Sequence, residues 1–334
     1  MLAKPSTAFI SPAAGNKMIR EVSSIALATI LATALSGCAT IAESTETRGS
    51  AQEEAGLNDE QLLDASDIPS SFEDKMLVED EALSQQLASI ANSHAGSYAI
   101  ACQATNGSWS ARVNSTDAYV SASMIKLAVM GAFYNAAANG NVNLEDTVIL
   151  QASDIVGGTS YISLQGAGST WTYRELLQHM IQDSDNTATN ILIDRLGMDT
   201  INDWASGFGL ENTHLNRRMM DLGSGVENYM SANDVAKILQ AICDGSFVNE
   251  DASMEALTVL EGQNETTGME LGLPNDVIFA HKTGSLNGVL NDGGIVETEK
   301  PYTIVVLSAN ADSGEAAAAM QEIALAISAY ASAR

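Results

Sequence analysis

Basic residues are scarce in this chain of 334 residues, which has 15 lysines and arginines against 42 aspartates and glutamates. The formal net charge at pH 7 is −27. A surface of that charge repels a nucleic acid at long range, and no basic run or arginine-rich stripe offsets the repulsion. The composition therefore excludes nucleic-acid binding, and we expect no nucleic-acid partner.

Cysteine, histidine and aromatic residues are also few. Three cysteines exclude a disulfide scaffold or a cysteine-rich zinc module, and two of them, Cys102 and Cys243, either form a disulfide or stay as buried thiols. The four histidines form no H-E-x-x-H or H-x-x-E-H pair, so we expect no metal and no cofactor. Aromatic residues make up 5% of the chain, which predicts a mostly aliphatic core.

Residues 1–38 resemble an export signal. Lys17 and Arg20 supply a basic segment, and the apolar stretch that follows has the length of a signal peptide's apolar core but is short for a transmembrane helix. The stretch ends in Leu-Ser-Gly-Cys, which resembles the lipobox of bacterial lipoproteins, and Met18 is a second candidate for the start. We expect Cys38 to carry a lipid that anchors the protein to a membrane outside the cytoplasm. The alternative is an ordinary signal, which would give a secreted or periplasmic protein.

Residues 39–82 form a separate acidic segment, with 13 acidic residues against Arg48 and Lys75. Such a composition buries too little apolar surface to offset the entropy lost on ordering. We predict an extended tether that holds the domain at 83–334 away from the membrane.

The two ends of that domain both predict strands. Residues 97–103 and 109–113 alternate around an Asn-Gly turn, which is typical of a hairpin, and 302–308 form an apolar strand followed by a helix over 314–333. Helical spacing of apolar residues fills the middle, over 124–137, 173–181, 187–196 and 232–242. The predicted fold class is α+β, with an antiparallel sheet formed by both ends of the domain, helices on its faces and an inserted all-helical lobe.

The first motif whose residues could carry out a reaction is Ser123-x-x-Lys126, where an alternating stretch turns into an apolar helix. If Ser123 opens that helix, Lys126 lies on the same face one turn later. A desolvated lysine can take the proton of a serine hydroxyl, and backbone N–H groups at a helix start can hold an oxyanion. The alternative is a serine N-cap with a solvated lysine.

The second motif is Ser184-Asp185-Asn186, between two predicted helices. A hydroxyl and a carboxamide two residues apart on a turn can point into one site, where the hydroxyl relays a proton and the amide orients a lysine and a substrate. The same residues also make an ordinary helix-capping turn.

The third motif is Lys282-Thr283-Gly284-Ser285, after an apolar stretch. A lysine and two hydroxyls on an edge strand can bind a carboxylate, and the glycine lets a substrate backbone approach closely. The alternative is a polar strand end. We expect the neighbouring His281 to be a hydrogen-bonded strand histidine.

In this order the three motifs resemble the signature of the penicillin-recognising serine hydrolases, which include the class A β-lactamases and the penicillin-binding proteins. The stretch from residue 171 to 177, running into 183–192, is similar to a helix pair of the class A enzymes. The resemblance covers the chain from about residue 83 onward. It implies a β-lactamase/transpeptidase-like fold.

The resemblance also implies roles for the motif residues. Ser123 would be the acylated nucleophile and Lys126 its base or part of the base relay, while Ser184 would pass the proton to the leaving nitrogen. Asn186 would hold the acyl amide of the substrate.

The K-T-G segment would bind the substrate carboxylate through Lys282, Thr283 and Ser285. The backbone N–H groups of Ser123 and Ser285 would form the oxyanion hole.

Two departures from the class A pattern concern the later step, hydrolysis of the acyl-enzyme. The class A loop that begins like Leu215-Asn216-Arg217 carries a glutamate that activates the water, and Met219 stands at its place here. Asp221 is the nearest carboxylate and Glu227 a more distant one. Alternatively, Arg217 and Arg218 pair with Asp221 and fix the loop.

The second departure follows K-T-G. Residues 286–296 contain no arginine, although many class A enzymes use one beyond this strand to hold the β-lactam carboxylate.

Three functions remain open at this point. The favoured one is a class A-type β-lactamase. The others are a D,D-peptidase or penicillin-binding protein that acts on peptidoglycan peptides, and a lipid-anchored module without turnover. In each case we expect a monomer.

Overall fold

The structure, a computed structural model, describes residues 77–158 and 160–334. The expected export signal, its Cys38 and most of the predicted acidic tether lie outside these residues. In the part of the chain that is described, no helix combines the length and the apolarity that a membrane crossing requires.

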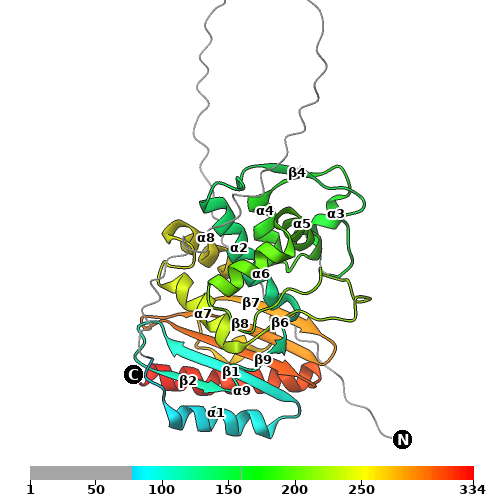
Figure 1. Cartoon of the computed structure of the whole chain (residues 1–334). Helices are drawn as coiled ribbons and strands as arrows, with labels where there is room; N and C mark the ends of the chain where they lie inside the picture. Colours follow the sequence, from blue (N-terminus) through cyan, green and yellow to red (C-terminus); the bar gives the residue numbers. More distant parts are fainter. Residues whose placement is uncertain (1–76, 159) are drawn as a thin grey trace, which may run out of the picture. The chain divides into compact units, whose positions relative to one another are not determined.

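A five-stranded sheet in the order β2-β1-β9-β8-β7 forms the base of the fold (Figure 1). Its strands are β1 (Ser97–Ala104), β2 (Ser110–Val113), β7 (Ile278–Leu286), β8 (Val289–Glu297) and β9 (Tyr302–Ala309). Every neighbouring pair is antiparallel. The N-terminal hairpin therefore pairs with the C-terminal strands, which confirms the predicted sheet.

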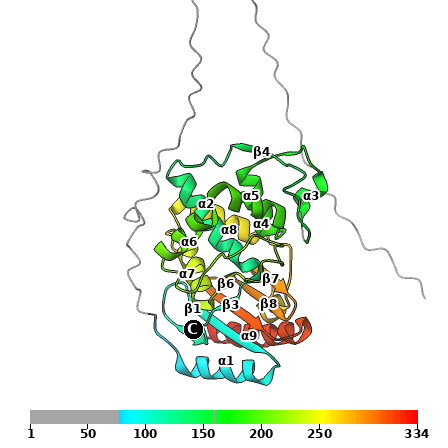
Figure 2. The same cartoon turned by 45° about the vertical axis from the view of Figure 1, so that its right-hand side comes forward.

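Two helices cover one face of the sheet, α1 (Glu81–Ser93) and α9 (Ser313–Ser332), as Figure 2 also shows. Each begins at an aspartate whose side chain accepts backbone hydrogen bonds, Asp80 from Leu83 and Asp312 from Gly314 and Glu315. This capping stabilises a helix start by about 1 kcal/mol. The alanines of α9 and the aliphatic residues of β1 and β9 form one core on this face.

The other face of the sheet carries the predicted helical lobe. Its helices are α2 (Lys126–Ala138), α3 (Tyr161–Gln165), α4 (Tyr173–Gln182), α5 (Asn186–Leu196), α6 (Met198–Gly207), α7 (Ala232–Cys243) and α8 (Glu250–Glu261). One short helical turn, η2 (Ala122–Ile125), and two small strand pairs complete it. Those pairs are β3 (Tyr119–Val120) with β6 (Tyr229–Met230), and β4 (Thr147–Ile149) with β5 (Thr170–Thr172). A second turn, η3 (Met269–Gly272), packs against α9 on the opposite face of the sheet.

Helix α2 is buried on nearly all sides and forms the centre of the second core, between the sheet and the other helices. It begins at Lys126, two residues later than the spacing predicted, because the preceding residues form the 3₁₀ turn η2. Cys102 lies in the core under α1 and α9, whereas Cys243 packs against the lobe core. Both are free thiols, so the alternative of a disulfide between them is not realised.

Close packing of α2 on α6 predicts the effect of one substitution. A Cβ at Gly131 would lie 2.0 Å from Cη2 of Trp204, whose ring is held between Phe208 and Phe247. Gly131→Ala should therefore lower the free energy of unfolding by about 1–3 kcal/mol in urea denaturation, despite alanine's better helix propensity. Gly223→Ala is the control, since a Cβ there meets nothing within 4 Å, and it should change stability by less than about 0.5 kcal/mol. Equal stability of the two variants would contradict tight packing at this crossing.

Candidate active site

Ser123 lies in η2, directly before α2. Its neighbours Ala122 and Met124 are buried, whereas Ser123 itself is partly exposed. Ala122 has a φ of 47°, a left-handed backbone that is unfavourable for a residue with a Cβ. Ser123 is thus the accessible residue of a strained turn that is fixed by the core, an arrangement common at functional sites. The prediction that Ser123 opens the long helix is wrong by one turn, since it lies in the 3₁₀ segment before it.

The ammonium group of Lys126 joins the first two motifs. Lys126 is fully buried, and its Nζ donates to the carbonyl of Ser184 at 2.6 Å, to Ser184 Oγ at 3.1 Å and to Asn186 Oδ1 at 3.0 Å. Ser184 has a φ of 52°, and this reversal turns both its carbonyl and its hydroxyl toward the lysine. The alternative of a solvated lysine is therefore wrong.

Lys282 on β7 brings in the third motif. It is also fully buried, and its Nζ donates to Ser184 Oγ at 3.1 Å and to the carbonyl of Thr283 at 2.9 Å. The hydroxyl of Ser184 therefore lies between two lysine amines that come from the lobe and from the sheet. Three motifs far apart in the sequence meet at this one oxygen.

Burial and mutual repulsion set the protonation of the two lysines. Burial, and then the charge of Lys282, hold the pKa of Lys126 well below its usual range, although Asp185 and Glu265 oppose this. Burial lowers the pKa of Lys282 to about 8, against the opposing effect of Glu265 and Asp292. Lys126, whose pKa is the one held well below its usual range, is therefore the amine of the two that is suited to act as a base, because only a neutral amine can accept a proton.

Gly284 allows β7 to contact the Ser123 turn. A Cβ at this position would lie 2.9 Å from the carbonyl oxygen of Ser121 and 3.1 Å from the amide nitrogen of Ser123. Gly284 therefore lets β7 approach the protein's own turn, and the expected approach of a substrate backbone at this glycine stays a prediction. Asn291 on β8 reinforces this contact, because its Nδ2 donates to the carbonyls of Val120 and Ser121 at 3.0 and 3.2 Å.

The other members of the third motif lie on the same strand, beyond Lys282. Thr283 is buried, and Ser285 is exposed near the end of β7. Thr283 Oγ1 donates to Glu265 Oε2 at 2.7 Å. Sequence reasoning assigned Glu265 no role, since it lies in an irregular segment before η3 with no periodic pattern or motif around it.

The loop expected to carry a catalytic carboxylate has a different arrangement. Met219 is buried, and its backbone N–H and C=O both bond to the side-chain amide of Asn190, at 2.8 and 3.1 Å. The chain then reverses at Met220, with a φ of 65°, and the following Asp221 is exposed. The structure therefore does not bring Asp221 into the hydrogen-bonded group formed by the two lysines.

The expectation that Arg217 and Arg218 pair with Asp221 is wrong. Arg217 Nη2 lies 2.6 Å from Glu227 Oε2, and Arg218 Nη2 lies 2.7 Å from Asp194 Oδ2. The reversal at Met220 explains this, because Asp221 follows it on the outside of the loop. The arginines fix the loop through other partners.

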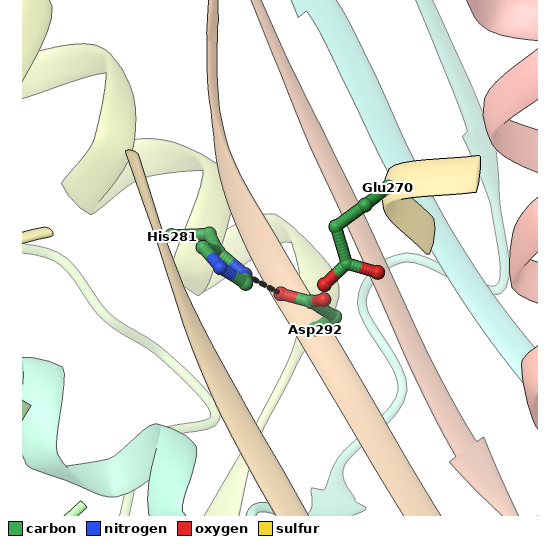
Figure 3. A group of neighbouring side chains, drawn as sticks. All are labelled: Glu270, His281 and Asp292. Carbon is green, nitrogen blue, oxygen red and sulfur yellow. Dashed lines mark hydrogen bonds and ion pairs between the residues drawn. The ribbon is translucent and has the colours of Figure 1, made fainter. Parts of the chain in front are cut away.

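One cluster next to Lys282 has the composition of a metal site. Figure 3 shows Glu270, His281 and Asp292, whose ligand atoms lie within 4.8 Å of one another. However, Asp292 Oδ1 bonds to His281 Nδ1 at 2.9 Å and its Oδ2 accepts from Thr267, while both oxygens of Glu270 accept backbone hydrogen bonds from Thr267 and Gly268. The carboxylate oxygens are thus already used by the protein, and His281 is the hydrogen-bonded strand histidine that was expected.

Comparison with known proteins identifies the family of the chain. A model of the β-lactamase enzyme family matches residues 82–331. The chain is 25% identical over 233 residues to the β-lactamase CTX-M-8 of Citrobacter amalonaticus, which covers 67% of this chain and 79% of that protein. A β-lactamase of Bacteroides uniformis is 27% identical over 177 residues, or 47% of this chain and 58% of that one.

Solved structures show the same fold. A β-lactamase of Sphaerobacter thermophilus superposes with a TM-score of 0.70 at 28% identity, covering 76% of this chain and 99% of that one. PBP-A superposes with a TM-score of 0.72 at 23% identity, covering 77% and 98%. The chain therefore belongs to the β-lactamase enzyme family. It is a β-lactamase-type serine hydrolase.

The pKa of Lys282 predicts how the activity depends on pH. Protonated Lys282 supplies a positive charge and a hydrogen bond to Ser184, and raising the pH through about 8 removes its proton. The rate of opening of a chromogenic cephalosporin should therefore fall above pH 8. In Lys282→Arg, which stays charged, that fall should move to higher pH, even if the rate is lower throughout. An unchanged upper limb in Lys282→Arg would assign the fall to another group.

Proposed function

We propose that the protein opens the amide bond of β-lactams by forming an ester on Ser123. Neutral Lys126 accepts the proton of the Ser123 hydroxyl as Oγ bonds to the lactam carbonyl carbon. The carbon–nitrogen bond then breaks, and Ser184 passes a proton to the leaving nitrogen. Ser184 recovers a proton from Lys126, which becomes neutral again. The observation that carries this proposal is the Ser184 hydroxyl, which is within 3.1 Å of both buried amines.

The remaining motif residues would bind the substrate during this step. The backbone N–H groups of Ser123 and Ser285 are the proposed oxyanion hole, supported by the close contact of Gly284 with the Ser123 turn. Loss of one such donor typically costs about 3–4 kcal/mol of transition-state stabilisation. Asn186 would hold the acyl amide, and Lys282 would provide the positive potential.

Hydrolysis of the resulting ester requires a group that assists the attacking water. A methionine cannot accept a proton from water, and Met219 is held at the expected position by Asn190. We propose Asp221 as the group that assists the water. Because its carboxylate is exposed and separated from the lysines, we expect this hydrolysis to be slow.

The main proposal is therefore a class A-type β-lactamase with slow deacylation. The relatives named β-lactamases support it. The buried Met219 favours a second candidate, a penicillin-binding D,D-peptidase that cleaves peptidoglycan peptides and is trapped by β-lactams. PBP-A has the same fold, and a single-residue mutant of PBP-A was solved as an acyl-enzyme complex with penicillin G.

We also propose a location for the enzyme. The lipobox-like sequence ending at Cys38 supports a lipid anchor on a membrane outside the cytoplasm, with the acidic segment as its tether. A monomer agrees with a site whose three motifs all come from one chain.

A chromogenic cephalosporin separates the candidate functions. Incubation should give an adduct of one opened lactam on the intact protein by mass spectrometry, and Ser123→Ala should abolish it. Hydrolysis of many cephalosporin molecules per protein molecule would favour the β-lactamase, whereas one long-lived adduct per protein molecule would favour the penicillin-binding protein. Absence of both turnover and adduct would contradict the proposed function.

The lifetime of that adduct tests the role of the loop. Met219→Glu places a carboxylate at a position whose backbone is fixed by Asn190. A positioned general base typically raises a reaction rate by about 10²–10⁴-fold. We therefore expect the lifetime of the adduct to shorten by at least about tenfold. Asp221→Asn should lengthen it and leave acylation unchanged. Leu222→Glu, which adds a carboxylate at an exposed position of the same loop, is the control. An unchanged lifetime in Asp221→Asn would remove Asp221 from the mechanism.

A further inference from the structure

A carboxylate of the protein lies at the hydroxyl that the family signature assigns to the substrate. Glu265 Oε2 accepts the hydrogen bond of Thr283 Oγ1 at 2.7 Å. A threonine hydroxyl has one hydrogen to donate, so a second acceptor at Thr283 has to displace the first. Glu265 therefore occupies the place at which a substrate carboxylate would be bound.

The segment that carries Glu265 is anchored to the end of α4. Asn264 donates from its backbone N–H to the carbonyl of Gln182 at 3.0 Å, and from its side chain to Asp183 Oδ1 at 2.8 Å. Gln263 donates to the carbonyl of Ile181 at 2.9 Å and accepts from the backbone N–H of Glu265 at 3.0 Å. The backbone before and at Glu265 is thus fixed next to the Ser184 turn.

The other end of the segment is anchored to the sheet by the cluster in Figure 3. Thr267 Oγ1 donates to Asp292 Oδ2 at 2.6 Å, and Glu270 accepts from the backbone N–H groups of Thr267 and Gly268 at 3.2 and 2.9 Å. Asp292 is buried on β8, opposite Thr283 on β7. With both ends held, Glu265 is positioned over Thr283 by the fold and not by chance orientation of a surface side chain.

The effect of Glu265 on the pKa values of the two lysines agrees with its position near Thr283. Glu265 is the charge that most strongly opposes the lowering of the Lys282 pKa, and it acts in the same direction on Lys126. It is therefore close enough to both amines to affect their charge. In addition, the strand β8 carries no arginine that could hold an incoming carboxylate.

We propose that Glu265 is a specificity-determining residue that selects against a carboxylate on the substrate at this position and favours an uncharged hydrogen-bond donor there, such as a carboxamide. Two carboxylates near one hydroxyl repel each other, and Lys282 already has an anionic neighbour. A carboxamide N–H can instead donate to Glu265 and leave its bond with Thr283 in place. This inference rests on the proposed acylation of Ser123.

The test uses a matched pair of substrates, a chromogenic cephalosporin and the same compound with its ring carboxylate converted to a carboxamide. The second-order rate constant of acylation is measured for each, together with the mass of the adduct. In the wild-type protein the acid should react no faster than the amide. In Glu265→Gln the acid-to-amide ratio should rise at least about tenfold, mainly through tighter binding of the acid.

Glu261→Gln is the matched control. It removes one negative charge four residues earlier, at an exposed position of α8, and it should leave the ratio at the wild-type value. Glu265→Ala, which also removes the acceptor of Thr283, should raise the acid-to-amide ratio as well. A rise in both variants would show that it does not come from a new contact of the glutamine side chain.

The possible outcomes distinguish the specificity role of Glu265 from the acylation of Ser123. Adducts on Ser123 with an acid-to-amide ratio that is the same in Glu265→Gln and wild type would overturn the specificity role but keep the proposed function. A wild-type preference for the acid of tenfold or more would overturn it as well. No adduct with either compound would overturn the proposed function and, with it, this inference.

Discussion

The burial of two lysine amines around the hydroxyl of Ser184 is the interaction on which the rest of the site depends. Moving an ammonium group out of water costs several kcal/mol unless polar groups compensate it, and two such groups also repel each other. Here the compensation comes from oxygens at fixed positions, the carbonyls of Ser184 and Thr283 and the amide of Asn186. For Lys126, burial and the charge of Lys282 outweigh this compensation, and the pKa of its amine lies well below the usual range.

The fold supplies these oxygens from both of its halves. Lys126 belongs to the most buried helix of the lobe, and Lys282 to a strand that the C-terminal part of the chain adds to the sheet. The left-handed backbone at Ala122 and Ser184 costs of order 1–3 kcal/mol at each residue. That cost is tolerated because the flanking segments are buried and hold both residues in this conformation.

The sequence predicted the parts of this arrangement that depend on local patterns. The hairpin at residues 97–113, the strand at 302–308 and the helical stretches follow from periodicity and turn residues, and strands at both ends of the domain predicted one shared antiparallel sheet. The order of its five strands was not predicted. The three motifs were recognisable because each is a short string of residues. That they form one site was predicted from resemblance to a family, since no local rule brings residues so far apart together, and the structure adds that both lysines bond to Ser184 Oγ.

The features that the sequence did not predict depend on packing between residues distant in the chain. The 3₁₀ turn at Ser123 packs closely on Gly284 of β7, a residue distant in sequence. Likewise, Arg217 and Arg218 pair with Glu227 and Asp194 and not with Asp221, because the reversal at Met220 redirects the chain. Glu265 has the least local signal of all, and only the anchors at both ends of its segment bring it to Thr283.

The charge balance at the site gives Glu265 its significance. The overall charge of −27 already opposes the approach of an anion, so a site for a carboxylate would need a local excess of positive charge. Two lysines are present, yet three carboxylates, Asp185, Glu265 and Asp292, act on them electrostatically. When Lys126 is neutral, as its role as a base requires, the negative charges outnumber the positive ones further. An anionic substrate therefore finds little net attraction here, whereas an uncharged group that donates a hydrogen bond to Glu265 meets no such opposition.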